Sequence, residues 1–183
     1  MFVICTHPTE SVAHLLNSCT RFTNFRSRRH DRIVSKINQF IKNNTDFTTY
    51  ENKMAYTIFI QQNENLRNLE HGKPDLICIN GNRIIVVEIT ICYDLYIDYA
   101  YEEKLRRYAP LIRILTETGY TTDLKILCFG SLGTIEKSVY SALYSFTNNK
   151  KLVKDTIKWC SISAIIAANY IWRYRVKYTT ELV

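Results

Sequence analysis

The fold of this chain is constrained most by the stretch from Lys73 to Thr90, KPDLICINGNRIIVVEIT. It contains two apolar runs, Leu76 to Ile79 and Arg83 to Cys92, on either side of Asn80-Gly81. Because Asn and Gly both tolerate positive φ, this pair predicts a β-hairpin. Apart from Arg83, Glu88 and Thr90, the second run is apolar on both alternating faces, a pattern typical of a strand buried between two layers. The hairpin therefore predicts a sheet that is covered on both sides.

The rest of the chain supplies helices for those layers. Ile33 to Ile41, followed by Asn43-Asn44, and Asp98 to Thr118 both show apolar residues at helical spacing. Pro110 predicts a kink in the second helix or a break into two helices. Five further elements are expected: a short helix at Glu10 to Cys19, a strand or helix end at Tyr56 to Gln61, a strand at Leu124 to Phe129, and helices at Thr134 to Phe146 and Asp155 to Trp172. This order predicts an α/β fold with a small mixed β-sheet flanked by helices.

Counting across the hairpin places Glu88 near a second acid, Asp75. A two-residue loop at Asn80-Gly81 puts Asp75 opposite Val86, and a four-residue loop puts it opposite Glu88. Either register places both carboxylates on one face, whereas a three-residue loop separates them. Two such acids repel and raise each other's pKa unless a cation lies between them, and a hard ion such as Mg²⁺ prefers oxygen ligands. The alternative is that Glu88 lies on a solvated edge or pairs with a basic neighbour such as Lys73.

The charge of the chain favours a polyanionic partner. Its 24 Lys and Arg residues outnumber 17 Asp and Glu, for a net charge of +7. Basic residues concentrate between Arg21 and Lys36, where Asp31 is the single acid. Such a segment is often a solvated face, but it also suits nucleic acid. The chain has 5 glycines and no phosphate-cradling loop, which argues against a nucleotide-binding enzyme.

Cysteine use and hydropathy indicate an intracellular protein. The 6 cysteines are widely spaced and most lie in apolar runs, so we expect a reducing compartment without a disulfide framework. The longest late apolar run, Ile162 to Ala168, is too short to span a bilayer, and we expect a soluble chain that does not enter a membrane.

Several motifs occur in an order that resembles a known family. Pro74-Asp75, twelve intervening residues and Glu88-x-Thr90 resemble the core of PD-(D/E)XK nucleases, with threonine in place of lysine. KPDL, VVEIT, a tyrosine-aspartate pair and a helix with Lys104-Leu-Arg-Arg-Tyr108 together resemble the restriction-like endonuclease domain of site-specific non-LTR retrotransposons. In that family the catalytic lysine lies on the following helix, in a K-x-x-K-Y pattern. Lys104 and Tyr108 stand at the matching positions, with Arg107 for the second lysine.

The resemblance extends upstream of the hairpin. Cys5, His14 and Cys19 resemble the last three ligands of that family's CCHC zinc knuckle, and Arg29-His30-Asp31 resembles the RHN-like motif that follows. Structural zinc takes four ligands, so either a longer knuckle begins before this chain or His7 substitutes. The resemblance divides the chain into residues 1–28, a partial zinc-knuckle-like segment with a basic linker, and residues 29–183, the endonuclease domain. Zinc is thus a candidate cofactor beside the divalent ion.

The resemblance assigns roles at the site. Asp75, Glu88 and the backbone carbonyl of Ile89 would bind Mg²⁺ or Mn²⁺, Lys104 would orient water or neutralise charge on the phosphate, and Tyr108 would support it. A further acid from the upstream region is expected in this superfamily, and the candidates are Glu51, Glu64 and Glu70. His30 is either near the phosphate or a packed or capping histidine. The residues expected to contact DNA are Arg21, Arg26, Arg28, Arg29, His30, Arg32, Lys36, Lys73 and Arg107.

The function implied by the resemblance is nicking of target DNA for target-primed reverse transcription in the nucleus. The expected partners are DNA and the reverse transcriptase domain of the same polyprotein, and a homodimer is left open. One alternative is a structure-selective nuclease that resembles Holliday-junction resolvases. Another is a DNA-binding module that has lost catalysis, for which Thr90 in place of lysine is the relevant feature.

Overall fold

A mixed four-stranded sheet forms the centre of the described chain. The computed structural model describes residues 11–59, 64–69 and 71–180, with side chains described as far as residue 175. The sheet order is β1 (Thr48–Glu51), β2 (Leu76–Asn80), β3 (Arg83–Cys92) and β4 (Thr121–Gly130). β2 is antiparallel to both β1 and β3, and β4 is parallel to β3. The long α4 (Ile97–Glu117) makes the crossover that a parallel pair requires.

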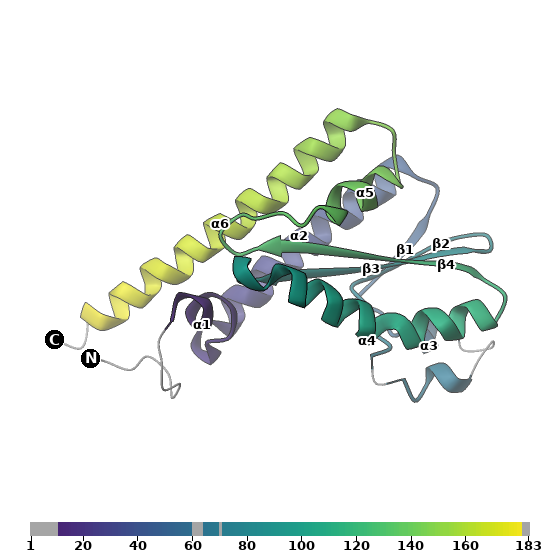
Figure 1. Cartoon of the computed structure of the whole chain (residues 1–183), viewed down its shortest axis with the longest axis horizontal. Coiled ribbons are helices and arrows are strands. Elements are labelled where there is room, and N and C mark those ends of the chain that lie inside the picture. Colours follow the sequence, from purple (N-terminus) through teal and green to yellow (C-terminus); the bar gives the residue numbers. More distant parts are fainter. Residues whose placement is uncertain (1–10, 60–63, 70, 181–183) are drawn as a thin grey trace.

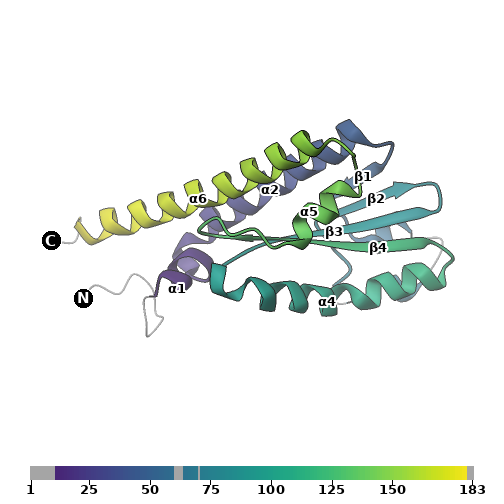
Figure 2. The ribbon, with the colours of Figure 1, turned by 45° about the horizontal axis from the view of Figure 1, so that its top comes forward.

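Helices cover both faces of this sheet, as the sequence predicts. Figure 1 shows α4 with the short α3 (Ala55–Ile58) below the sheet, and α2 (Thr23–Asn44), α5 (Ser138–Tyr144) and α6 (Lys150–Thr180) above it. Figure 2 shows α6 running beside α2 and extending past the sheet toward α1 (Val12–Asn17). Short 3₁₀ turns complete the chain at η1 (Thr20–Phe22), η2 (Glu64–Leu66) and η3 (Asp94–Tyr96). The predicted α/β layering with a small mixed sheet is confirmed.

The burial of β3 on both sides follows from its sequence. Ile85, Val87 and Ile89 pack in the core beneath α2, α5 and α6, whereas Ile84 and Val86 pack in a second core beneath α4. All five side chains are at most 1% exposed. β3 is therefore the strand that joins the two cores, and a charged side chain on it must find its partners inside the protein.

The sequence prediction missed one strand and misplaced the bounds of several other elements. β1 was not predicted, because a four-residue polar strand at a sheet edge has almost no hydrophobic pattern of its own. Helix α2 begins at Thr23, so the basic segment is part of the amphipathic helix rather than a linker before it. Helix α5 begins at Ser138 rather than Thr134, because Ile135 bridges to Phe129 and extends the β4 edge first.

Helix α4 is continuous through Pro110, so the predicted alternative of a break into two helices is wrong. Proline removes the hydrogen bond to the carbonyl four residues earlier, which belongs to Arg106. The Arg106 side chain is 81% exposed, so that turn faces solvent and water can satisfy its carbonyl. In the described residues, no helix combines the length and apolar character that crossing a membrane requires.

Candidate active site

The hairpin register places Asp75 directly opposite Glu88. Asn80 pairs with Arg83 and Leu76 pairs with Val87, so the next opposed positions, one residue before β2 begins, are 75 and 88. The two-residue loop consists of Gly81 and Asn82, and Gly81 has φ +55°. The turn therefore lies one position later than the predicted turn at Asn80-Gly81. The pairing of Asp75 with Glu88 is the one that the sequence analysis predicted for a four-residue loop between the strands. Both carboxylates come to the same end of the sheet, with Asp75 8% and Glu88 3% exposed.

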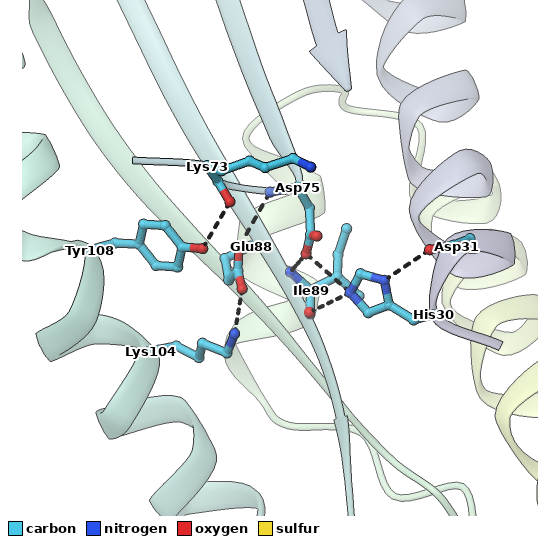
Figure 3. Close-up of polar contacts among 8 residues, drawn as sticks. All are labelled: His30, Asp31, Lys73, Asp75, Glu88, Ile89, Lys104 and Tyr108. Carbon is cyan, nitrogen blue, oxygen red and sulfur yellow. Dashed lines mark hydrogen bonds and ion pairs between the residues drawn. The ribbon is translucent and has the colours of Figure 1, made fainter. Parts of the chain in front are cut away.

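β3 continues past the start of β2, and the Asp75 side chain takes over the hydrogen bonding there. Pro74 has no backbone N–H, so the ladder cannot continue in that direction. Instead the Ile89 backbone N–H donates to Asp75 Oδ2 at 2.7 Å, and the Asp75 backbone N–H donates to Glu88 Oε2 at 3.3 Å (Figure 3). The two acids are thus held by backbone groups of two neighbouring strands, which makes their positions rigid.

Helix α4 supplies a cation to this pair. Lys104 Nζ donates to Glu88 Oε1, and the two charged groups form an ion pair (Figure 3). Burial, and then repulsion by Asp75, raises the pKa of Glu88, while Lys104 acts in the opposite direction. Tyr108, one turn further along α4, donates its hydroxyl to the carbonyl of Lys73 at 3.3 Å. Burial, and then the charge of Glu88, raises the pKa of Tyr108.

Helix α2 supplies a second cation from the opposite layer. His30 Nε2 lies 3.1 Å from the Ile89 carbonyl oxygen and 3.3 Å from Asp75 Oδ2, and its Nδ1 lies 3.4 Å from Asp31 Oδ1 (Figure 3). Burial disfavours the charged ring, but the hydrogen bond and attraction of Asp75, with help from Ile89 and Asp31, outweigh it and raise the pKa of His30 to about 9. A positive imidazolium therefore lies against two of the three expected metal ligands.

The structure thus brings together the main residues singled out from the sequence. Asp75, Glu88 and the Ile89 carbonyl lie at one end of the sheet, with Lys104 on one side and His30 on the other. In the described part of the chain, no group of three or more His, Cys, Asp and Glu side chains is arranged to hold a metal ion. A metal here would rest on two carboxylates and a backbone carbonyl, a donor set of hard oxygens that suits Mg²⁺.

Two of the three candidates for a further acid can be placed in the structure. Glu51 pairs with Leu76, which belongs to the core beneath α2, and its carboxylate accepts from Asn38 Nδ2 at 2.6 Å. It therefore faces α2, whereas Glu88 faces α4. Glu64 is an exposed residue at the start of η2. Glu70 lies outside the described residues.

The zinc-knuckle prediction is only partly covered by the structure. Cys5 and His7 lie outside the described residues. His14 is buried in α1, and Cys19 is fully buried in a cluster with Leu16 and with Ile171 of α6. The zinc site stays a prediction. The proposed boundary between residues 28 and 29 falls inside α2, which runs without interruption from Thr23 to Asn44.

The basic residues of α2 divide into buried and exposed groups. Arg29 is buried, and its Nη2 donates to the Leu16 carbonyl and to Asn17 Oδ1, each at 3.3 Å. Burial, and then the neighbouring Arg26, lowers the pKa of Arg29 to about 10. Arg26 donates to the Cys19 carbonyl. The remaining expected DNA contacts on α2 and before it are exposed or half-buried: Arg21, Arg28, Arg32 and Lys36.

Two adjoining grooves border the site. One of about 290 Å³ is lined by Arg26, Arg29 and His30, and a larger one of about 930 Å³ is lined by Tyr93, Tyr96 and Tyr99. Lys104 and Thr90 line both. The sequence analysis used Tyr93 only as part of the tyrosine-aspartate pair and did not single out Tyr96 and Tyr99, although the spacing of three residues just after a strand was a usable signal. It also missed Trp159 of α6, whose ring lies 5.2 Å from the Arg32 guanidinium and 5.4 Å from Lys36 Nζ.

Comparison with known proteins relates this chain to a mobile element. No protein-family model matches the chain. It is 25% identical over 132 residues to the retrovirus-related Pol polyprotein from type-1 retrotransposable element R2 of Popillia japonica. The match covers 69% of this chain and 25% of the polyprotein, so the chain corresponds to about a quarter of that relative's length. This similarity supports an origin in a retrotransposable element.

Proposed function

We propose that this chain is a Mg²⁺- or Mn²⁺-dependent DNA endonuclease domain with a PD-(D/E)XK core. It would nick target DNA in the nucleus so that a reverse transcriptase of the same non-LTR retrotransposon polyprotein primes on the new 3′-hydroxyl. The observation that carries the proposal is the convergence of Asp75, Glu88 and the Ile89 carbonyl with Lys104 at the open end of the sheet. The similarity to a retrotransposon polyprotein supports the biological setting.

Each residue has a role that its position supports. Asp75, Glu88 and the Ile89 carbonyl would hold the divalent ion, which supplies Lewis acidity toward the phosphate and lowers the pKa of an attacking water. Lys104 places an ammonium beside this pair, where it can neutralise charge that develops on the phosphate. Tyr108 holds the chain at Lys73, immediately before the Pro74-Asp75 step, and so keeps Asp75 in place.

The test is nicking of supercoiled plasmid by the purified chain. With Mg²⁺ or Mn²⁺ the parent should produce open circles, and Asp75→Asn or Glu88→Gln should slow this by roughly 10²-fold or more, because each removes a charged ligand. Glu117→Gln, on the exposed end of α4, is a matched control and should nick at the parental rate. Circular dichroism and DNA binding of each variant separate loss of chemistry from loss of fold. Parental rates in both acid variants would contradict the proposed site.

A second candidate function is a DNA-binding module without catalysis. The observation that favours it is that His30 and Lys104 already neutralise the carboxylates that a metal would need. In that case DNA binding should be independent of divalent ions, and neither Mg²⁺ nor Mn²⁺ should produce nicks at any protein concentration. A junction-selective nuclease is distinguished in the same assay by faster cleavage of four-way junctions than of linear duplex.

A further inference from the structure

The larger groove beside the candidate site has an aromatic wall that the proposed chemistry does not use. Tyr96 is 57% and Tyr99 73% exposed, so neither ring belongs to the core. Tyr93 and Tyr96 contact each other with ring centroids 6.0 Å apart, and all three tyrosines line the groove. Its volume of about 930 Å³ is at the upper end of the ~300–1,000 Å³ typical of ligand pockets.

This aromatic groove continues directly from the candidate catalytic residues. Lys104 and Thr90 line it, and the same two residues line the smaller groove that contains Arg26, Arg29 and His30. A single DNA strand that crosses the site would therefore pass from the smaller, basic groove on the α2 side to the larger, tyrosine-lined groove on the α4 side. The scissile phosphate would lie between the two grooves, beside Lys104.

The aromatic groove also contains positive charge. Arg107 lines it, and the buried Arg107 Nε has no hydrogen-bond partner among the residues that the structure describes. Among the described residues that line the groove, the one acid is Glu103, which is already paired with Arg107 at 2.9 Å and approached by Arg106 at 3.6 Å. The groove thus combines exposed ring faces with a guanidinium and an ammonium, the combination that binds single-stranded nucleic acid.

We propose that this groove binds unpaired nucleotides of the strand to be cut, next to the scissile phosphate, with their bases stacked on Tyr96 and Tyr99. The inference rests on the proposed endonuclease function and narrows its substrate to DNA that is locally unpaired beside the cut. Bases within a duplex are stacked on both faces and paired at their edges, so they cannot reach these rings. Unpaired bases stack on aromatic side chains without regard to sequence.

The direct test is base stacking by fluorescence. A 40-mer duplex with a four-nucleotide bubble carries 2-aminopurine in the bubble, and the same label is placed in a fully paired duplex. In EDTA, the parent should quench the bubble label on binding. Tyr96→Ala/Tyr99→Ala should lose the quenching and bind the bubble roughly 30-fold more weakly or worse, the lower limit expected for the loss of two stacked bases. The variant Tyr96→Phe/Tyr99→Phe should restore both the quenching and the binding of the bubble, because phenylalanine keeps the aromatic rings.

Two controls make the result specific. Tyr140→Ala removes an exposed tyrosine from α5, on the other side of the sheet, and should behave as the parent. Binding of the fully paired duplex should be nearly equal in the parent and in the double alanine variant. Equal bubble binding and equal quenching in the parent and the double alanine variant would overturn the inference.

Cleavage separates this inference from the proposed function. With Mg²⁺ or Mn²⁺, a parent that cuts the bubble substrate about 10-fold faster than the paired duplex supports the inference. A parent that cuts both at one rate, with no effect of the tyrosine substitutions, contradicts it and leaves the nuclease intact. Absence of cleavage in every substrate contradicts the nuclease function, and the fluorescence result in EDTA then still decides whether the groove binds unpaired bases.

Discussion

Glu88 is a buried carboxylate whose charge depends on one neighbour. Its backbone is fixed in the central strand, so the side chain cannot move to solvent, and burial together with Asp75 disfavours its ionised form. Lys104 supplies the compensating charge from α4. Removal of one partner of a buried pair costs more than removal of both, because the remaining charge is left without a counter-ion.

We therefore expect Lys104→Met to lower the free energy of unfolding at pH 7 by roughly 2 kcal/mol. The loss should shrink at acidic pH, where Glu88 is protonated in both the folded and unfolded states. Urea unfolding at pH 7 and at acidic pH measures the loss of unfolding free energy and its decrease with pH. The double variant Glu88→Gln/Lys104→Met should recover part of the loss, since it removes the uncompensated charge. A single variant as stable as the parent would show that the ion pair does not form in solution.

Asp94 controls the turn that follows β4. Its Oδ2 accepts from the Leu132 backbone N–H at 2.8 Å, and its Oδ1 accepts from the Thr134 N–H at 2.9 Å. A Cβ on Gly130 would overlap the Asp94 carboxylate, so this close approach requires glycine. Burial opposes ionisation of Asp94, but these hydrogen bonds outweigh it and lower its pKa.

The lowered pKa of Asp94 predicts a pH dependence of stability. A carboxylate with a depressed folded pKa stabilises the protein above its unfolded pKa of about 3.9, and this contribution is lost as pH falls through the folded value. Asp94→Asn should therefore cost about 1 kcal/mol at pH 7 and progressively less below pH 4, as measured by thermal unfolding. Asp46→Asn, at an exposed position, is the control and should be as stable as the parent at pH 7. A constant difference between Asp94→Asn and the parent from pH 3 to pH 7 would refute the role of charge.

At the scale of elements, α4 contains a proline that removes one of its backbone hydrogen bonds. Pro110 lies inside a continuous helix and deprives the Arg106 carbonyl of its hydrogen bond. Pro110→Ala should raise the free energy of unfolding by roughly 1 kcal/mol, because the restored bond outweighs the greater freedom of the unfolded chain. The melting temperature measures the change. A decrease would mean that the packing of α4 depends on the proline ring.

For the whole molecule, charge is concentrated on the α2 and α6 face. Arg28 and Arg32 lie one turn apart on α2 and line a groove of about 270 Å³ against α6. Trp159 of α6 holds the Arg32 guanidinium and Lys36 ammonium over its ring. This surface adjoins the groove that leads to His30, and in the proposed function it would bind the phosphates of duplex DNA.

Salt dependence of DNA binding tests this surface. Each phosphate contact contributes about −0.9 to the slope of log K against log salt, so Arg28→Gln/Arg32→Gln should reduce the slope by about 2. Lys150→Gln/Lys151→Gln, at the exposed start of α6, removes the same charge and should change the slope far less. Equal effects of the two pairs would indicate binding governed by net charge alone.

Local sequence predicted the central elements and the closeness of the two candidate acids. The apolar runs around Asn80-Gly81 predicted the hairpin, and the period of two placed Asp75 and Glu88 on one face. Helix α4 was recognisable from its apolar stripe, whereas Lys104 was singled out only by the resemblance to the endonuclease family. β1 was not, because its pairing with β2 depends on the neighbouring strand rather than on its own residues.

Sequence by itself determined that β3 is buried on both faces and that Asp75 and Glu88 share one face of the hairpin, because strand alternation and hydrophobicity are local properties. Tertiary structure alone decided which hairpin register is used, that His30 reaches the Ile89 carbonyl, that Arg29 is buried against α1, and that three tyrosines wall a groove beside Lys104. These features depend on how separate layers pack against one another. The period of a single segment carries no information about that packing, since it concerns residues distant in the chain.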